Sequence, residues 1–184
     1  MPVSKILQHG ARRGSLCYRR LMMRQLFLLI AFCFSAPAAD DWGPVQFLLG
    51  RWTAEGGPAG SAGAFSFLPD LQGKILVRKS FAEYPASAGR PALRHDDLTV
   101  IYREEGSSRL KALYWDNEGH VITYTVTSTQ GGVVFRSEGA PEQTRYRLSY
   151  VTLAENRVQI RFDIAPPGKD FAPYLESRAR RQTP

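Results

Sequence analysis

Apolar and polar residues alternate with a period of two through most of the sequence after about residue 50. One clear run is Val158, Ile160, Phe162 and Ile164, which alternate with polar neighbours. Successive side chains of a strand point to opposite faces, so this pattern predicts strands with one dry and one wet face. Helical periodicity does not extend beyond one turn at residues 44–49. The sequence therefore predicts an all-β fold.

Turn residues separate these runs at regular intervals. The strongest turn signal is Asp116-Asn117-Glu118-Gly119, because Asn and Gly tolerate the positive φ that tight hairpins require. About ten strands are expected, near residues 51–56, 62–68, 74–84, 95–103, 109–116, 120–127, 133–138, 144–152, 157–164 and 171–180. Ten short antiparallel strands in one domain need two packed sheets or closure, and closure alone removes the edges. We expect a ten-stranded antiparallel up-and-down β-barrel with a short helical turn before its first strand.

The first 38 residues have the composition of a secretory signal peptide. An apolar run from Leu26 to Phe34 follows Arg24, and Ala36 and Ala38 form a small-residue cleavage site. The run is about half the length of the roughly 20 residues that a membrane-spanning helix needs. Met22 or Met23 would serve as a later start. We expect a signal peptide at 1–38, a single barrel domain at 39–184 and a periplasmic or secreted location, with no transmembrane segment after cleavage.

Removal of that segment changes what the charge implies. The formal net charge is +7, but residues 1–38 hold six of the 24 basic residues and none of the 17 acidic ones. The remaining 18 basic residues nearly balance the acids, so the basic excess that would suggest a nucleic-acid partner disappears. Both cysteines, Cys17 and Cys33, also lie in the predicted signal peptide. The rest of the chain has no thiol for a disulfide, for catalysis or for a metal.

A short helical turn runs into Gly50-Arg51-Trp52 at the first predicted strand. This arrangement resembles the opening of lipocalins and the wider calycin superfamily. Together with the stretches 116–122 and 164–168, it is similar to a group of bacterial exported proteins of unknown function with lipocalin-like barrels. The resemblance implies that Trp52 plugs the closed end of the barrel under a basic residue of the last strand, Arg178 or Arg180. Nitrobindin-type relatives bind haem through a late histidine, but no histidine follows His120, so no cofactor is expected.

The direction of the first strand sets the open end of the barrel. In a simple meander, the loops at 57–61, 85–94, 117–119, 139–143 and 165–170 all lie opposite Trp52. Long loops on a rigid frame commonly carry binding sites, so residues 85–94 are the predicted lid. The apolar phase of each strand is expected to point inward. That places the following residues inside: Phe65, Phe67, Ile75, Val77, Phe81, Val100, Tyr102, Tyr114, Ile122, Tyr124, Phe135, Tyr146, Tyr150 and Phe162.

Such a lining suits a small apolar or amphipathic ligand. The predicted ligand-binding residues share this inward phase; they are Lys79, Phe81, Tyr102, Tyr114, Asp116, His120 and Tyr124. We expect the ligand to pass between the 85–94 loop and the 116–120 hairpin. Other interpretations stay open, since Asp116 also suits a turn cap, His120 a solvated rim position, and the aromatic residues a solid core.

Three functional classes fit this architecture. The first is a carrier of a small hydrophobic molecule. The second is an isomerase or hydrolase with His120 as general base beside Asp116 or Tyr114. The third is an interaction protein with a filled barrel, and the sequence leaves the oligomeric state open. No metal-ligand spacing, Gly-x-Ser-x-Gly motif or phosphate loop occurs in the sequence, so we expect neither a metal site nor a catalytic nucleophile.

Overall fold

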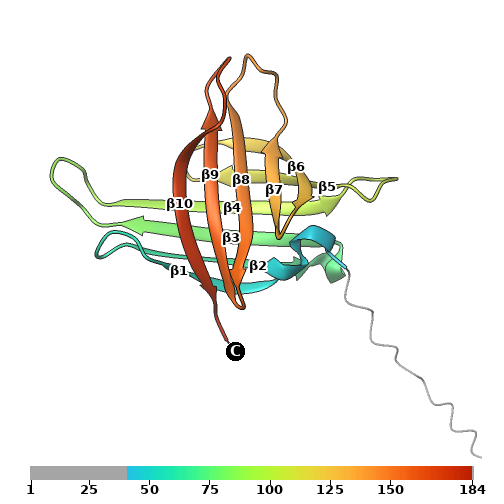
Figure 1. Cartoon of the computed structure of the whole chain (residues 1–184), viewed down its shortest axis with the longest axis horizontal. Coiled ribbons are helices and arrows are strands. Elements are labelled where there is room, and N and C mark those ends of the chain that lie inside the picture. Colours follow the sequence, from blue (N-terminus) through green and yellow to red (C-terminus); the bar gives the residue numbers. More distant parts are fainter. Residues whose placement is uncertain (1–40, 184) are drawn as a thin grey trace, which may run out of the picture. The chain divides into compact units, whose positions relative to one another are not determined.

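The alternating segments form ten antiparallel strands in the computed structural model, which describes residues 41–183 (Figure 1). Each expected strand is present, with ends that differ by at most two residues from the sequence-based ranges. The strands are β1 (Gly50–Glu55), β2 (Ala62–Asp70), β3 (Ile75–Tyr84), β4 (Leu93–Arg103), β5 (Leu110–Asp116), β6 (Val121–Thr129), β7 (Gly132–Ser137), β8 (Arg145–Ala154), β9 (Arg157–Ala165) and β10 (Ala172–Arg181). Two short 3-10 helices, η1 (Gly43–Leu48) and η2 (Leu71–Gly73), complete the described chain.

Each strand pairs with the next along the chain, and β10 returns to pair with β1, so the sheet closes into a barrel. The closing register places Trp52 opposite Arg181 and Glu55 opposite Arg178. In Figure 1, β7–β10 run across the direction of β2–β5, and the β7–β8 and β9–β10 loops project together at the top. Closure leaves no unpaired strand edge to recruit another chain. The predicted fold class is therefore confirmed.

The predicted signal peptide at 1–38 lies outside the described residues. Among residues 41–183, no helix is long and apolar enough to cross a membrane.

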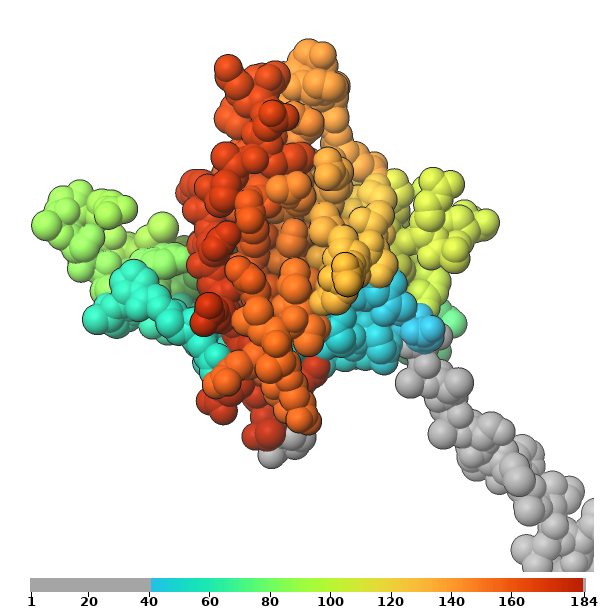
Figure 2. All heavy atoms as spheres, viewed as in Figure 1, coloured from blue at the N-terminus to red at the C-terminus, as the bar shows by residue number. Residues whose placement is uncertain are grey.

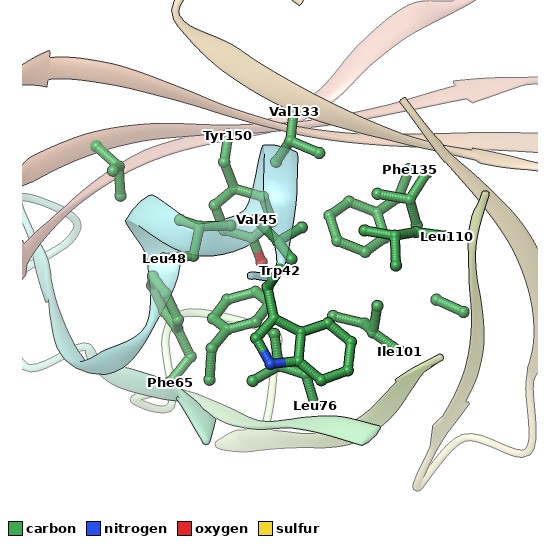
Figure 3. Packing of buried hydrophobic residues seen from close by; sticks show 14 of the residues in the cluster. Trp42, Val45, Leu48, Phe65, Leu76, Ile101, Leu110, Val133, Phe135 and Tyr150 are labelled. Carbon is green, nitrogen blue, oxygen red and sulfur yellow. The ribbon is translucent and has the colours of Figure 1, made fainter. Parts of the chain in front are cut away.

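The end of the barrel where β1 begins is filled by apolar side chains. From η1, Val45 and Leu48 are fully buried, and Trp52 is only 1% exposed. The Trp52 indole N–H donates a hydrogen bond to the Leu48 carbonyl oxygen at 2.8 Å. Its ring stacks on Phe65 with the centroids 5.8 Å apart. Residues of η1 thus pack into the same cluster as residues of β2, β3, β4, β7 and β8 (Figure 3).

The basic residue over Trp52 is Arg181, and not Arg178 or Arg180 as expected. Its guanidinium carbon lies 4.4 Å from the indole centroid. The same group donates hydrogen bonds to the carbonyl oxygens of Phe47 and Leu49. Ala179 is fully buried, so alternation along β10 sends residue 181 inward and residues 178 and 180 outward. Arg180 instead pairs with Glu55 on the outer surface.

The inward phase of β3 and β4 is the opposite of the expected one. Leu76 and Ile101 are fully buried, and Arg78 and Thr99 are 7% and 3% exposed. The alternate residues, which were expected inside, therefore face outward; they are Ile75, Val77, Lys79, Phe81, Val100 and Tyr102. The expectation was wrong because both phases of these strands contain apolar residues. The inner phase also contains buried charges, which made it look like the solvent phase in the sequence.

Candidate ligand-binding site

A buried ion pair between β3 and β4 marks the middle of the barrel interior. The Arg78 guanidinium contacts the Asp97 carboxylate, and the two side chains are 9% and 6% exposed. Burial by itself would lower the pKa of Arg78, but the Asp97 charge and the nearby Tyr150 and Tyr114 outweigh it and raise that pKa. Arg78 therefore stays charged. Its guanidinium also lies 5.6 Å from the centroid of the Phe65 ring.

Three buried polar atoms of the interior have no hydrogen-bond partner among the described residues. They are Arg78 Nε, the Thr99 hydroxyl and the Tyr150 hydroxyl. Arg78 and Thr99 lie directly opposite each other on β3 and β4. Leaving a polar group buried without a partner costs about 1–3 kcal/mol, so native proteins rarely tolerate it without a reason. All three atoms are closed to solvent, and the Tyr150 hydroxyl lies beside the Arg78 guanidinium.

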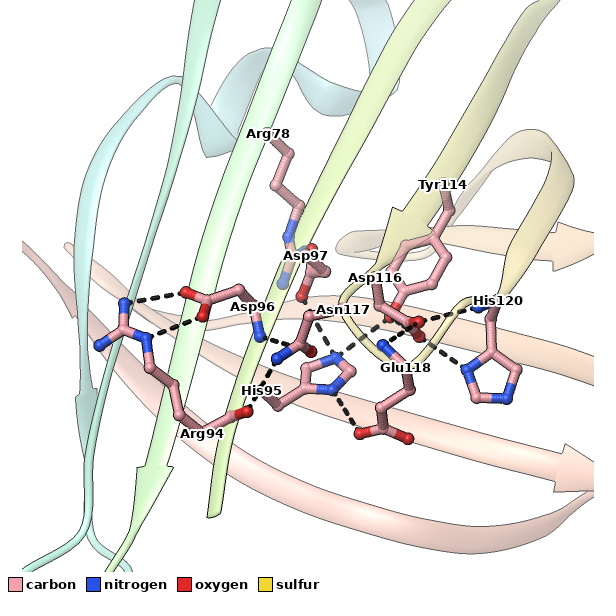
Figure 4. Close-up of polar contacts among 10 residues, drawn as sticks. All are labelled: Arg78, Arg94, His95, Asp96, Asp97, Tyr114, Asp116, Asn117, Glu118 and His120. Atoms are coloured by element: carbon pink, nitrogen blue, oxygen red, sulfur yellow. Dashed lines mark hydrogen bonds and ion pairs between the residues drawn. The ribbon is translucent and has the colours of Figure 1, made fainter.

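Polar contacts connect this ion pair to the barrel rim (Figure 4). His95 Nε2 lies 3.8 Å from an Asp97 oxygen and 3.2 Å from the Tyr114 hydroxyl. That hydroxyl donates to Asp116 at 3.0 Å. The other ring nitrogen, Nδ1, lies 2.9 Å from a Glu118 carboxylate oxygen. The His95 ring therefore connects the interior to the hairpin.

The Asp116 carboxylate is the common hydrogen-bond acceptor at the rim of the barrel. It accepts hydrogen bonds from the backbone N–H groups of Glu118 and His120, at 3.0 and 2.9 Å, and it lies 2.8 Å from His120 Nδ1. Burial would raise the pKa of Asp116, but the hydrogen bonds from His120, Tyr114 and Glu118 prevail and lower it. Asp116 is thus both a turn cap and a partner of the His120 imidazole, half of which is exposed to solvent.

Four of the seven predicted site residues lie at or inside the open half of the barrel. Tyr114 and Tyr124 point inward and meet edge to face, with ring centroids 6.2 Å apart. Asp116 and His120 lie at the rim. Burial raises the pKa of Tyr114, with a further contribution from the Asp97 charge, so its hydroxyl stays protonated as a donor.

The other three predicted residues, Lys79, Phe81 and Tyr102, belong to the outward phase of β3 and β4 and do not reach the interior. Lys79 is exposed, and the Phe81 ring is covered by the exposed Arg94 guanidinium at 4.7 Å. Tyr102 follows the fully buried Ile101 and so faces away from it.

The sequence-based site omitted Arg78, His95 and Asp97. These three residues come from the strands whose phase was assigned the wrong way. Arg78 and Asp97 carry opposite charges and face the same side, but this relation follows from the strand register and not from the local pattern.

Apolar side chains complete the open half of the interior. Ile122, Tyr146 and Leu148 are partly buried and pack against the core cluster. Tyr146 stacks on Phe162 with an interplanar angle of 4° and a centroid distance of 6.0 Å. Solvent reaches this part of the lining, in contrast to the sealed end below it. An aromatic and aliphatic lining beside a few polar groups is typical of sites for amphipathic molecules.

The expected access route between the 85–94 loop and the 116–120 hairpin is closed where β4 begins. Asn117 exchanges hydrogen bonds with Asp96 through its backbone N–H at 3.0 Å and its side-chain oxygen at 3.1 Å. Its side-chain amide also donates to the Arg94 carbonyl oxygen at 3.0 Å. A ligand cannot pass between segments that are joined in this way.

Two hollows of the described structure lie on the outer surface. One, of about 500 Å³, is lined by Glu55, Gly56, Leu153, Arg157 and Arg178. The other, of about 350 Å³, lies over the outer faces of β7, β8 and β9. Neither hollow is lined by residues of the barrel interior.

Among residues 41–183, no group of three or more His, Cys, Asp or Glu side chains is arranged to hold a metal ion. Comparisons of the sequence with protein-family models and with curated proteins found no match. The closed barrel and its interior chemistry thus carry the functional argument, and the resemblance to lipocalins and to nitrobindin-type barrels stays a prediction.

Proposed function

We propose that this protein is an exported, lipocalin-like barrel that binds a small amphipathic molecule in the open half of its interior. The observation that carries the proposal is the set of three buried, unpartnered polar atoms on Arg78, Thr99 and Tyr150. A ligand with a hydrogen-bonding head group would satisfy them, while its apolar part would lie against Ile122 and Tyr146. The polar head would then sit deep in the barrel and the apolar part nearer the rim.

The sealed end supports the same arrangement. Trp52, Phe65 and Phe67 fill the interior below Arg78, and edge-to-face contacts connect Phe67, Tyr150 and Phe135. A ligand therefore cannot pass beyond the ion pair. Because the buried ion pair lies at the bottom of the open half, a ligand would meet a charged group at its inner end. Such a barrel should therefore prefer molecules with one polar end.

Thr99→Val tests this proposal with little risk to the fold. The change keeps the shape of the side chain and removes a buried hydroxyl that has no partner. Because that hydroxyl contributes no intramolecular hydrogen bond, the unfolding free energy should stay the same or rise. Titration with the amphipathic fluorescent anion 8-anilinonaphthalene-1-sulfonate should show a dissociation constant raised about fivefold, since one neutral hydrogen bond to the probe is lost.

Thr123→Val is the matched control, because Thr123 lies between the inward-facing Ile122 and Tyr124 of β6 and so points outward. It should leave probe binding unchanged. Equal probe binding by the wild type and both variants would show that the interior polar atoms do not contact the probe, and the proposal would then fail. Native mass spectrometry of protein purified from its own cells would add the mass of any carried ligand.

A further inference from the structure

Three arginines surround one phenylalanine ring on the outside of the barrel. Arg136 on β7 and Arg145 and Arg147 on β8 place their guanidinium carbons 5.1, 5.3 and 4.6 Å from the centroid of Phe171. We call these four residues the arginine cluster. Arg136 and Arg147 lie directly opposite each other in the sheet, and Phe171 reaches them from the segment before β10. The outer face of β7–β10, which carries the cluster, is turned towards the viewer in Figure 2.

The ring holds the arginines in place. A guanidinium over an aromatic face gains roughly 0.5–1 kcal/mol at an exposed site, and the contact restricts an otherwise flexible side chain. Arg145 is held further by a hydrogen bond from its Nη2 to the Lys169 carbonyl oxygen at 2.7 Å. Pre-positioned guanidinium groups lose less conformational entropy when they bind a ligand than free surface arginines do.

Two arginines of the cluster have no ion-pair partner among the described residues. Arg147 and Arg161 share the fully buried carboxylate of Asp163, at 2.9 and 2.7 Å. Arg161 also lies 3.5 Å from Glu176. Within residues 41–183, neither Arg136 nor Arg145 has a carboxylate partner within 4.0 Å. Arg147 and Arg161 thus form ion pairs with two carboxylates, whereas Arg136 and Arg145 form none.

One acidic residue close to Arg136 in the sequence already has partners of its own. Glu138, two residues after Arg136, accepts hydrogen bonds from Lys111 and from Thr125 at 2.6 Å. In addition, Arg145 Nε is buried without an acceptor in the described structure. The guanidinium groups of Arg136 and Arg145 thus converge on Phe171 without an ion-paired carboxylate in the described chain, and this missing partner is the observation that points to a ligand.

A hollow of about 350 Å³ adjoins the cluster. Its lining includes Val134, Ser149 and Gln159 together with the ion-paired Arg147, Arg161 and Asp163. Arg147 belongs to both the cluster and the hollow, so a molecule bound at the arginines can extend into a recess with hydrogen-bonding groups and apolar walls. The recess is large enough for the non-anionic part of a small molecule.

We propose that the arginine cluster is a binding site for a phosphate monoester group, separate from the interior of the barrel. Guanidinium groups bind phosphate oxygens through paired, charge-assisted hydrogen bonds. A phosphate monoester carries close to two negative charges at neutral pH, which balances the two arginines that lack carboxylate partners. Arg136 supplies the exposed donors, Arg145 and Arg147 supply the flanking donors, and the hollow receives the rest of the ligand.

Calorimetric titration of the full chain with inorganic phosphate, at low ionic strength, tests the proposal. We expect one phosphate per chain. Arg136→Gln should weaken binding about tenfold, because one charge-assisted contact is lost. Arg136 is exposed and points away from the core, so the variant should keep the wild-type unfolding transition. Phe171→Leu should also weaken phosphate binding, since it removes the surface that positions the three guanidinium groups.

Arg157→Gln is the matched control, because Arg157 lies on the outer face of β9 but pairs with Glu55 outside the cluster. It should bind phosphate as the wild type does. Co-sedimentation with phosphatidylcholine vesicles that contain phosphatidic acid separates the two sources of a phosphate monoester. Binding to these vesicles that Arg136→Gln abolishes would assign a lipid head group, and binding to phosphate alone would assign a soluble ester. The proposal is overturned if neither probe binds, or if Arg136→Gln and Arg157→Gln bind equally well.

Discussion

The two halves of the barrel interior differ in how completely their buried polar groups are hydrogen-bonded. Around Trp52, the indole N–H, the ring face and the flanking carbonyl oxygens all have partners in Leu48, Phe65 and Arg181. Around Arg78, a buried charge is paired, but three polar atoms lack partners. A well-satisfied region contributes stability, whereas buried polar groups without partners reduce it. Under the proposed function, the first half maintains the fold and the second receives the ligand.

The largest effect is expected from removing the plug of the closed end. Trp52→Ala should lower the free energy of unfolding by about 3–5 kcal/mol, because a large, fully buried ring is replaced by a cavity. Urea denaturation followed by far-UV circular dichroism measures this loss. Trp115→Ala is the control: Trp115 is 36% exposed on β5, and its truncation should cost less than about 1 kcal/mol. Equal losses for the two variants would mean that the closed end is no more tightly packed than the surface.

The ion pair offers a second test of the same contrast. Asp97→Leu should cost about 3 kcal/mol, because the buried Arg78 charge loses its carboxylate. Arg78→Met combined with Asp97→Leu should recover most of that loss, since a buried pair can often be replaced by apolar residues without loss of stability. Urea titration of the wild type, the single variant and the double variant gives the unfolding free energies to be compared.

The double variant should at the same time lose binding of the anionic probe. If it were instead as unstable as Asp97→Leu alone, the pair would be needed for folding itself. The open half of the barrel would then not be a region kept polar for a ligand.

The strands could be predicted from the sequence because alternation and turn residues are local signals. The Asp116-Asn117-Glu118-Gly119 turn is a good example, since it lies between β5 and β6 as expected and Gly119 takes the positive φ of 93° that favours glycine. The site residues on these two strands, Tyr114, Asp116 and Tyr124, could be assigned to the interior for the same reason. In β5 and β6, the residues that face the interior are also the more apolar ones.

The phase of β3 and β4 could not be obtained in this way. Their inner rows contain Arg78, Asp97 and His95, while Val77 and Val100 face outward, so local hydrophobicity indicates the wrong side. A shift of phase by one residue moves every side chain of a strand to the other face, which is why Lys79, Phe81 and Tyr102 were all misplaced together. The interaction that sets the true phase, a charge pair across two strands, becomes visible only once the register is known.

The smallest expected effect is a pH dependence at the rim. Hydrogen bonds outweigh burial and lower the pKa of the Asp116 carboxyl group in the folded protein. In the unfolded chain this pKa returns to its ordinary value of about 3.9. Because the folded-state pKa is the lower one, the carboxylate stabilises the protein above about pH 4. This contribution is lost as the pH falls from there through the lowered pKa.

Asp116→Asn should therefore cost about 1 kcal/mol at pH 7, where the ionised side chain accepts several hydrogen bonds. The difference from the wild type should shrink in urea titrations repeated below pH 4, as the wild-type carboxylate becomes protonated. His120→Ala should show a smaller cost at pH 7, because it keeps the backbone N–H that donates to Asp116 and removes only the imidazole. A pH-independent cost for Asp116→Asn would show that the charge of the carboxylate adds nothing to its role as a cap, and the predicted pH dependence of the rim would then be wrong.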